Sequence, residues 1–185
     1  MGLKQHHRQQ PPDYFLNQVT LRSITADRAL ASGVTWAIVQ MLLLAAVGIA
    51  APRWPGHWQG KVRVSIGSAA FLYAAWTGLS GVFRLGRNRT PLPTPRADST
   101  LITTGIYAHL RHPLYASMMA MGLGWACLWS SAAALGLAAV LALFLHAKAR
   151  FEERLLRAKF ADYASYAARV PRYFPRLSKP QRSLP

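Results

Sequence analysis

Two adjacent carboxylates, Glu152 and Glu153, have the side-chain type needed to bind a cationic ligand. The chain has 6 acidic residues and a formal net charge of +16, so two neighbouring glutamates are unusual within it. They follow an uncharged apolar run, residues 113–145, which would place them at the rim of a membrane. A carboxylate that is partly removed from water attracts a cation more strongly than an exposed one. The pair therefore predicts a site for a positively charged group.

The same two glutamates have a simpler interpretation, in which they lie on a solvated helix surface. Lys148 precedes Glu152 by four residues, and Arg150 and Arg154 flank the pair. Ion pairs of this kind form readily on exposed helices and contribute little to stability. The residues alone leave both interpretations open.

The segment before the apolar run carries a second chemical signal, Arg111-His112-Pro113. Proline is common in the first turn of a helix, so a helix is expected to begin at Pro113. The first turn of a helix has unpaired N–H groups and a partial positive charge, which suit an anionic group such as a carboxylate. The alternative is that Arg111 and His112 are ordinary residues of the membrane interface.

The histidines do not predict a metal centre. His109 and His112 are three residues apart, but a histidine-based metal site needs several ligands together. The other histidines are scattered along the chain: His6, His7, His57 and His146. The basic residues do not predict nucleic-acid binding either, because membrane topology and anionic lipid headgroups account for them. We expect neither a metal nor a nucleic acid as a ligand.

Long apolar runs predict an all-α integral membrane helical bundle with about four spans. Residues 33–51 and 64–83 are uncharged, and each has about the ~20 residues needed to cross a bilayer. Residues 113–145 are too long for one span and predict a helical hairpin. No run of alternating residues predicts a parallel sheet.

The expected hairpin consists of two short helices, 114–129 and 132–146, joined at Ser130-Ser131. Gly122 and Gly124 in the first of them favour close helix packing, which small residues allow in membranes. After the hairpin, apolar residues at helical spacing predict a C-terminal amphipathic helix over residues 148–169.

The chain divides into three expected regions. Residues 1–32 form an N-terminal cytoplasmic or interfacial segment with a helix over residues 13–30, and residues 33–98 hold the first two spans and a proline-rich connector. Residues 99–185 form the catalytic region. Basic residues are concentrated in the N-terminal segment, the second loop and the tail, so the positive-inside rule places these in the cytoplasm. We therefore expect an inner-membrane protein whose termini and active site are cytoplasmic.

The residues that could bind a ligand or catalyse a reaction occur in an ordered set along the chain. Its parts are Gly105 with Tyr107, the run from Arg111 to Tyr115, Glu152-Glu153-x-x-Leu156 and the run from Arg169 to Pro175. This set resembles the family of membrane methyltransferases that contains isoprenylcysteine carboxyl methyltransferase, with phospholipid N-methyltransferases as more distant relatives. The resemblance covers roughly residues 99–175.

The resemblance implies that S-adenosylmethionine is the cofactor and that Glu152 contacts it directly. The implied cofactor-binding residues are Ser99, Thr100, Leu101, Ile102, Tyr107, His112, Pro113, Leu114, Tyr115 and Glu152. The candidate catalytic residues are Arg111, Lys148 and Glu153. Lys148 stands where the family has a substrate-contacting arginine, and lysine lacks the bidentate fork that matches a carboxylate. For an amine acceptor, Glu153 or His112 is the first candidate to take the proton.

The implied function is methyl transfer to an amphiphilic acceptor that enters from the bilayer, such as an isoprenylcysteine-type carboxylate. A phospholipid or a small thiol is an alternative acceptor. Membrane lipids are further expected partners. Three other classes of protein stay open: an NADPH-dependent membrane reductase, a non-catalytic membrane interaction protein, and a quinone- or haem-linked accessory protein.

Overall fold

The computed structural model describes residues 12–57, 60–86 and 100–176, with side chains from residue 33 onward. Within these ranges every regular element is helical, which confirms the expected all-α class. The elements are α1 (Pro12–Arg53), α2 (Lys61–Leu85), the short 3-10 helix η2 (Gly105–Ala108), α3 (Pro113–Leu128), α4 (Ala132–Lys159) and α5 (Tyr163–Arg169).

Three of the described helices are long and apolar enough to cross a membrane: the Gly33–Arg53 part of α1, α2 and α4. Helix α3 is also apolar but has 16 residues. At ~1.5 Å per residue it is about 24 Å long, shorter than the ~30 Å hydrocarbon core. Of the four expected spans, three are therefore long enough among the described residues, and the fourth, α3, is an apolar helix that is shorter than a full span.

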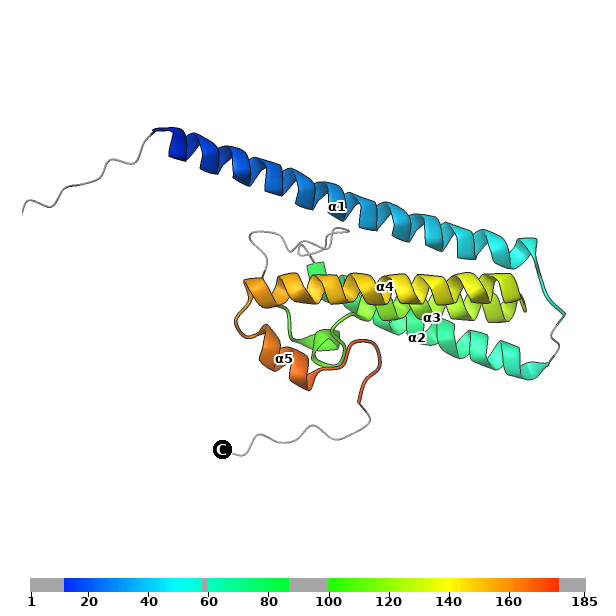
Figure 1. Cartoon of the computed structure of the whole chain (residues 1–185). Coiled ribbons are helices and arrows are strands. Elements are labelled where there is room, and N and C mark those ends of the chain that lie inside the picture. The colour runs from blue at the N-terminus through cyan, green and yellow to red at the C-terminus, as the bar shows by residue number, and fades with distance from the viewer. Residues whose placement is uncertain (1–11, 58–59, 87–99, 177–185) are drawn as a thin grey trace, which may run out of the picture.

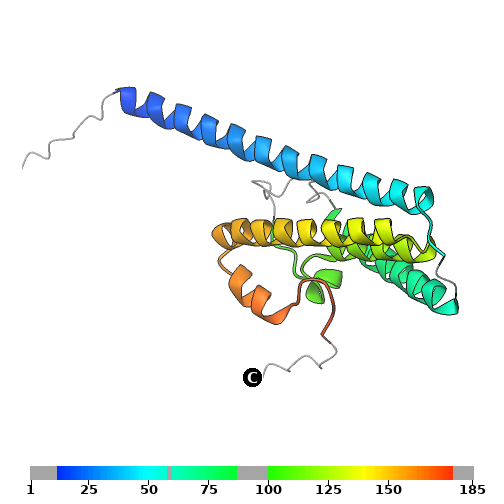
Figure 2. The same cartoon turned by 45° about the vertical axis from the view of Figure 1, so that its right-hand side comes forward.

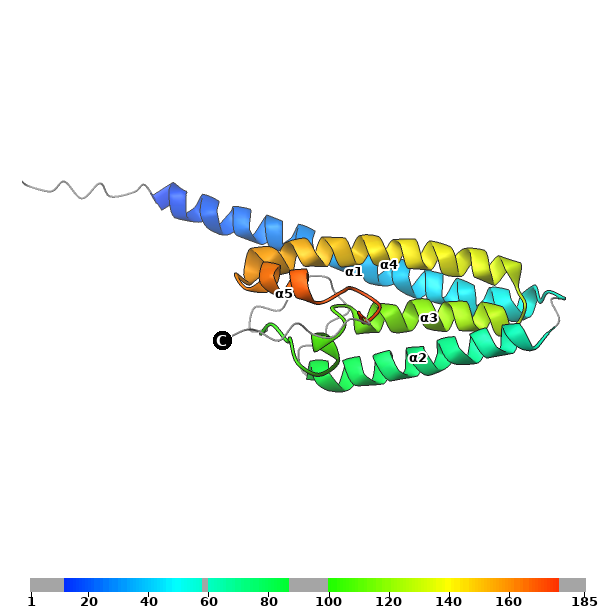
Figure 3. The same ribbon diagram turned by 90° about the horizontal axis from the view of Figure 1, so that it is seen from below.

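The helices form a bundle in which α3 lies between α2 and α4 (Figure 3). Helix α1 lies against α4 on the side away from α5 (Figures 1 and 2). The N-terminal end of α1 extends past the end of the bundle. The expected helix over residues 13–30 is not a separate element, because α1 continues through it into the first span. No proline interrupts residues 13–51, so nothing in the backbone stops the helix there.

Helix α4 is longer than expected. The sequence predicted that it would end near His146, whereas it continues to Lys159. Residues 146–159 contain neither proline nor glycine, so the helix does not stop where the apolar run gives way to charged residues. The expected amphipathic helix over residues 148–169 is therefore divided between the end of α4 and the separate helix α5. One rigid element thus carries Glu152 and Glu153 out of the apolar part of the bundle.

The hairpin between α3 and α4 turns at Ser130-Ser131, as expected. Ser130 has a positive φ of 54°, and the Ser131 side chain accepts a hydrogen bond from Ala134 N at 3.2 Å. Serine is a preferred N-cap because its oxygen pairs an N–H of the first turn. This short turn makes α3 and α4 antiparallel neighbours.

Glycines allow α2 and α3 to approach closely. A Cβ atom added at Gly124 of α3 would lie 3.0 Å from the backbone oxygen of Gly67 in α2 and 2.9 Å from Phe71 Cδ2. Gly78 and Gly81 on α2 face Ser117 and Leu114 of α3 in the same way. Small residues at such crossings let helix backbones pack against each other in membranes.

The contact at Gly124 gives a test of this packing. Gly124→Ala is expected to destabilise the bundle by about 1 to 3 kcal/mol, because the new methyl group overlaps the backbone of α2. Gly136→Ala on α4 is the matched control, since no atom lies within 4 Å of its added Cβ. There the exchange is expected to be neutral or slightly stabilising. Thermal unfolding of detergent-solubilised protein measures both, and equal shifts would contradict this account.

Candidate functional site

The first turn of α3 is held in place by a C-terminal segment, residues 170–174, which we call the strap. The backbone N of Arg111 donates to Pro171 O at 2.9 Å, and the N of His112 donates to Arg172 O at 3.0 Å. His112 is the N-cap of α3, and Pro113 follows in the first turn, as expected from the sequence. The strap therefore fixes the backbone at the point where α3 begins.

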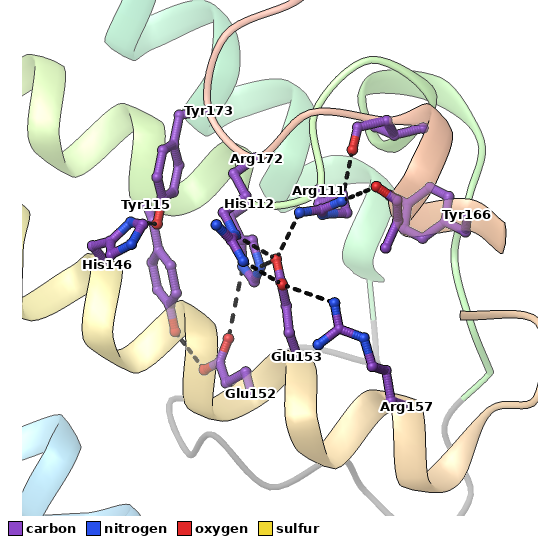
Figure 4. Close-up of polar contacts among 12 residues, drawn as sticks. Arg111, His112, Tyr115, His146, Glu152, Glu153, Arg157, Tyr166, Arg172 and Tyr173 are labelled. Atoms are coloured by element: carbon purple, nitrogen blue, oxygen red, sulfur yellow. Dashed lines mark hydrogen bonds and ion pairs between the residues drawn. The ribbon is translucent and has the colours of Figure 1, made fainter. Parts of the chain in front are cut away.

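Glu153 is fully buried, with 0% of its side chain exposed, and several cations surround it (Figure 4). Arg172 binds it with two hydrogen bonds, Nε to Oε1 at 2.9 Å and Nη2 to Oε2 at 2.8 Å. Arg111 Nη2 lies 3.0 Å from Oε1, and His112 Nε2 lies 3.2 Å from the same oxygen. Arg157, one turn further along α4, is 3.6 Å from Oε2. Glu153 thereby connects α4, the start of α3 and the strap.

The two arginines that pair with Glu153 are themselves held firmly. Arg111 Nη1 donates to the backbone oxygens of Ala167 and, at 2.9 Å, Val170. The hydrogen bonds from Arg172 to Glu153 raise the pKa of the Arg172 guanidinium above its usual value. Both arginines are therefore fixed positive charges, and the carboxylate between them is compensated.

Glu152 has a different environment. Its side chain is 17% exposed, Tyr115 donates its hydroxyl to Oε1, and His112 Nδ1 lies 3.8 Å from Oε2. Arg150 and Arg154, the residues that would pair with a surface glutamate, are exposed. Adjacent residues on a helix differ by about 100° in direction, so the two glutamates face different neighbours. The interpretation of the pair as a solvated helix surface is wrong.

Tyr115 lies between the side chains of His112 and Lys148. Its ring stacks on the His112 ring with a centroid separation of 5.4 Å and an interplanar angle of 3°. On α4, the Lys148 Nζ is 5.6 Å from the centre of the Tyr115 ring. Lys148 is 2% exposed and donates to Gln40 Oε1 on α1 at 2.7 Å. Helix α1 thus reaches the site through Gln40.

The remaining predicted residues flank this centre. Tyr107 is buried, and its backbone oxygen accepts a hydrogen bond from the Tyr166 hydroxyl at 2.7 Å. Burial, with a contribution from Glu152, raises the pKa of Tyr107 to about 12, so its hydroxyl keeps its proton at neutral pH. Leu101 packs against the side chains of α5, and Ile102 packs beside Tyr107.

Three further predicted residues lie at the edge of this cluster of side chains, and a fourth lies outside the described part of the chain. Pro113 is buried at the start of α3, and Leu114 points towards Gly81 of α2. Thr100 is exposed, and Ser99 lies outside the described residues. The structure brings Arg111, His112, Tyr115, Lys148 and both glutamates together, while their individual roles stay predictions.

Sequence reasoning missed four residues of this cluster: Gln40, His146, Arg172 and Tyr173. Arg172 and Tyr173 belong to the tail noted above, but no role was given to them. Tyr173 contacts His146 and lies over the His112 ring, with centroids 6.3 Å apart. Gln40 is a polar residue within an apolar span, a signal that could have directed attention to it.

A family model for phospholipid methyltransferases matches residues 62–163, more than half of the chain. The chain belongs to the phospholipid methyltransferase family. This membership and the apolar helices identify it as an integral membrane protein of a methyltransferase family. The match includes Arg111, His112 and both glutamates, while Gln40 and the strap lie outside it.

Two curated relatives are similar to this member of the phospholipid methyltransferase family. The cobalt-zinc-cadmium resistance protein of Cupriavidus metallidurans is 33% identical over 150 residues, covering 77% of this chain and 63% of the relative. The nickel-cobalt-cadmium resistance protein of Alcaligenes xylosoxydans is 32% identical over 149 residues, covering 77% and 64%. The chain thus spans less than two thirds of either relative. Among the residues that the structure describes, no group of three or more His, Cys, Asp or Glu could hold a metal ion.

The unequal environments of the two glutamates predict unequal effects on stability. Glu153→Gln is expected to lower the free energy of unfolding by about 3 kcal/mol or more, because Arg111 and Arg172 would be left without their counter-charge. Glu152→Gln, one residue away and isosteric, is the control and should cost clearly less. The unfolding midpoint in detergent measures both. Equal losses would show that Glu153 does not have the stabilising role described here.

Proposed function

We propose that this protein transfers a methyl group from S-adenosylmethionine to an amphiphilic acceptor that enters from the bilayer. The observation that supports this best is the contrast between the two glutamates: Glu153 pairs with Arg111, Arg157 and Arg172, whereas Glu152 is mostly buried and has no guanidinium partner among the residues that the structure describes. Membership of a methyltransferase family makes a cationic methyl donor the natural ligand for Glu152.

The electrostatics of the site agree with a zwitterionic donor of this kind. In a partly desolvated site the Glu152 carboxylate attracts an ammonium or sulfonium group strongly. The N-terminus of α3, with its partial positive charge, suits the carboxylate of the donor. Tyr107 and Tyr115 supply apolar ring surface beside Glu152. We therefore propose these residues, with His112, as the donor site.

The reaction at this site would be an in-line displacement at the methyl carbon. Such a step needs alignment of donor and acceptor and exclusion of water more than strong acid or base chemistry. The fixed geometry around Glu153 would help to align the donor and the acceptor, because it orients His112 and the first turn of α3. We propose Arg111 and Glu153 as residues that hold the site in shape and Lys148 as a contact for the acceptor.

The proposed acceptor is an amphiphile because the site lies where α3 and α4 leave the apolar part of the bundle. Lys148 is buried within the bundle, whereas Arg150 is exposed on the other side of α4. An isoprenylcysteine-type carboxylate, a phospholipid amine and a thiol are the acceptor groups to compare. We place the site and both termini on the cytoplasmic side of the inner membrane, where basic segments meet anionic lipids.

Donor binding tests the core of this proposal. Calorimetry on detergent-purified protein should detect S-adenosylmethionine or its demethylated product, and Glu152→Gln should weaken binding by about 1 to 3 kcal/mol. Asp162→Asn removes the same charge at an exposed position and should leave affinity unchanged. Binding of NADPH in place of the methyl donor would indicate a membrane reductase instead.

Acceptor entry from the bilayer is tested with radiolabelled donor. After incubation with total membranes, label should extract with the lipids, and His112→Ala should abolish this transfer. Added prenylcysteines, phosphatidylethanolamine and short thiols identify the acceptor group, since methyl esters are base-labile and methylated amines are not. Label found only in water-soluble products would contradict lateral entry.

A further inference from the structure

His146 and Tyr173 form a polar pair at the site that donor binding does not use. The Tyr173 hydroxyl lies 3.3 Å from His146 Nδ1, and the two ring centroids are 6.0 Å apart. Both side chains are half-buried, and one comes from α4 and the other from the strap. A histidine paired with a tyrosine hydroxyl is a common arrangement for moving protons.

The strap holds Tyr173 in place on both sides. His112 N donates to the carbonyl oxygen of Arg172, and the Tyr73 hydroxyl of α2 donates to that of Tyr173. Phe174 stacks on the Tyr73 ring with centroids 5.8 Å apart. The Tyr173 ring therefore has a fixed position next to His146 and Tyr115 (Figure 4).

The pair lies deeper in the bundle than the glutamates. His146 precedes Glu152 by six residues on the same helix, an axial distance of about 9 Å towards the apolar end. The Tyr115 ring lies between the pair and the carboxylate of Glu152 (Figure 4). A donor bound at Glu152 and an acceptor that enters from the bilayer would meet in this region.

Glu153 and His112 could also accept a proton at the site, but both already pair with charged or polar neighbours. Glu153 is bound by Arg111 and Arg172, whose fixed charges keep it ionised and paired. His112 has Nε2 on Glu153 and Nδ1 facing Glu152. His146 differs from both, because its described polar contact is the Tyr173 hydroxyl.

We propose that Tyr173 and His146 form a proton relay for an acceptor that must lose a proton on methylation, an amine or a thiol. This inference rests on the proposed function and specifies its acceptor class. A carboxylate is ionised at neutral pH and needs no relay.

In this relay an acceptor group, written X–H, passes its proton through Tyr173 to His146. The X–H bond breaks, its proton passes to the Tyr173 oxygen, and the proton of Tyr173 passes to His146 Nδ1. The electron pair left on X forms the bond to the methyl carbon, while the methyl–sulfur bond breaks and its electron pair stays on sulfur. Burial raises the pKa of Tyr173 to about 12, so its hydroxyl is protonated at rest, and it donates to His146 in the tautomer whose Nδ1 carries no proton. The His146 cation then returns its proton to water.

Charged and titratable groups of several elements lie around the pair. They are Tyr73 of α2, Arg111, His112 and Tyr115 at the start of α3, Glu152 and Glu153 of α4, and Arg172 of the strap.

The test uses the full-length protein with His146→Gln, Tyr173→Phe and the double variant. Methyl transfer to phosphatidylethanolamine, decanethiol and the lipids of total membranes is followed from pH 6 to pH 10. Each single variant should lose about 100-fold in rate at neutral pH. The deficit should shrink as pH rises, because solvent then deprotonates the acceptor. His57→Gln, in the exposed loop between α1 and α2, is the matched control and should keep the wild-type rate.

Two further readouts separate a relay from a structural role. The double variant should lose no more than either single variant, because two groups of one relay act as a unit. Affinity for S-adenosylhomocysteine should stay within about threefold of wild type in all variants. A loss that is additive and independent of pH, an unchanged rate, or base-labile ester products would overturn the relay. Absence of donor binding in the wild type would instead overturn the proposed function itself.

Discussion

The buried negative charge of Glu153 is the constraint on which the rest of the site depends. Removing a carboxylate from water costs several kcal/mol unless cations and hydrogen bonds replace the lost hydration. Here these come from Arg111 and His112 at the start of α3 and from Arg172 of the strap, which lies much further along the chain. Satisfying this one charge therefore requires the strap to return to the start of α3. That requirement also fixes the backbone of His112 and the position of Tyr173.

Glu153 and Glu152 differ in their partners. Glu153 is paired with arginines, whereas Glu152 accepts a hydrogen bond from Tyr115, and it is Glu152 that we propose for the cation of the donor. Tyr115 in turn connects the rim of the site with Lys148, and through it with Gln40 of α1. The site is thus a chain of contacts that runs from the strap to the first helix, across the end of the bundle. The proposed methyl donor and the proposed acceptor would lie at the two ends of this chain.

Local patterns predicted much of the architecture. The apolar runs located the membrane helices, and Ser130-Ser131 located the turn between α3 and α4, because hydrophobicity and N-capping are properties of a few neighbouring residues. The same patterns misplaced the end of α4 near His146. A change from apolar to charged residues marks the edge of a membrane, whereas a helix ends only where the backbone is interrupted or capped. The expected break before Gly33 failed for the same reason.

The sequence by itself determined that the chain is a helical membrane protein. It also indicated the candidate site residues, which are Arg111, His112, Tyr115, Glu152 and Glu153. Only the tertiary structure decided which of the two glutamates is paired with guanidinium groups. Two neighbours on a helix point about 100° apart, so their surroundings depend on what packs against each face. Those surroundings come from Arg111, His112 and Tyr115 at the start of α3 and from Arg172 of the strap. No local pattern encodes such contacts, because they exist only when separate segments of the chain pack together.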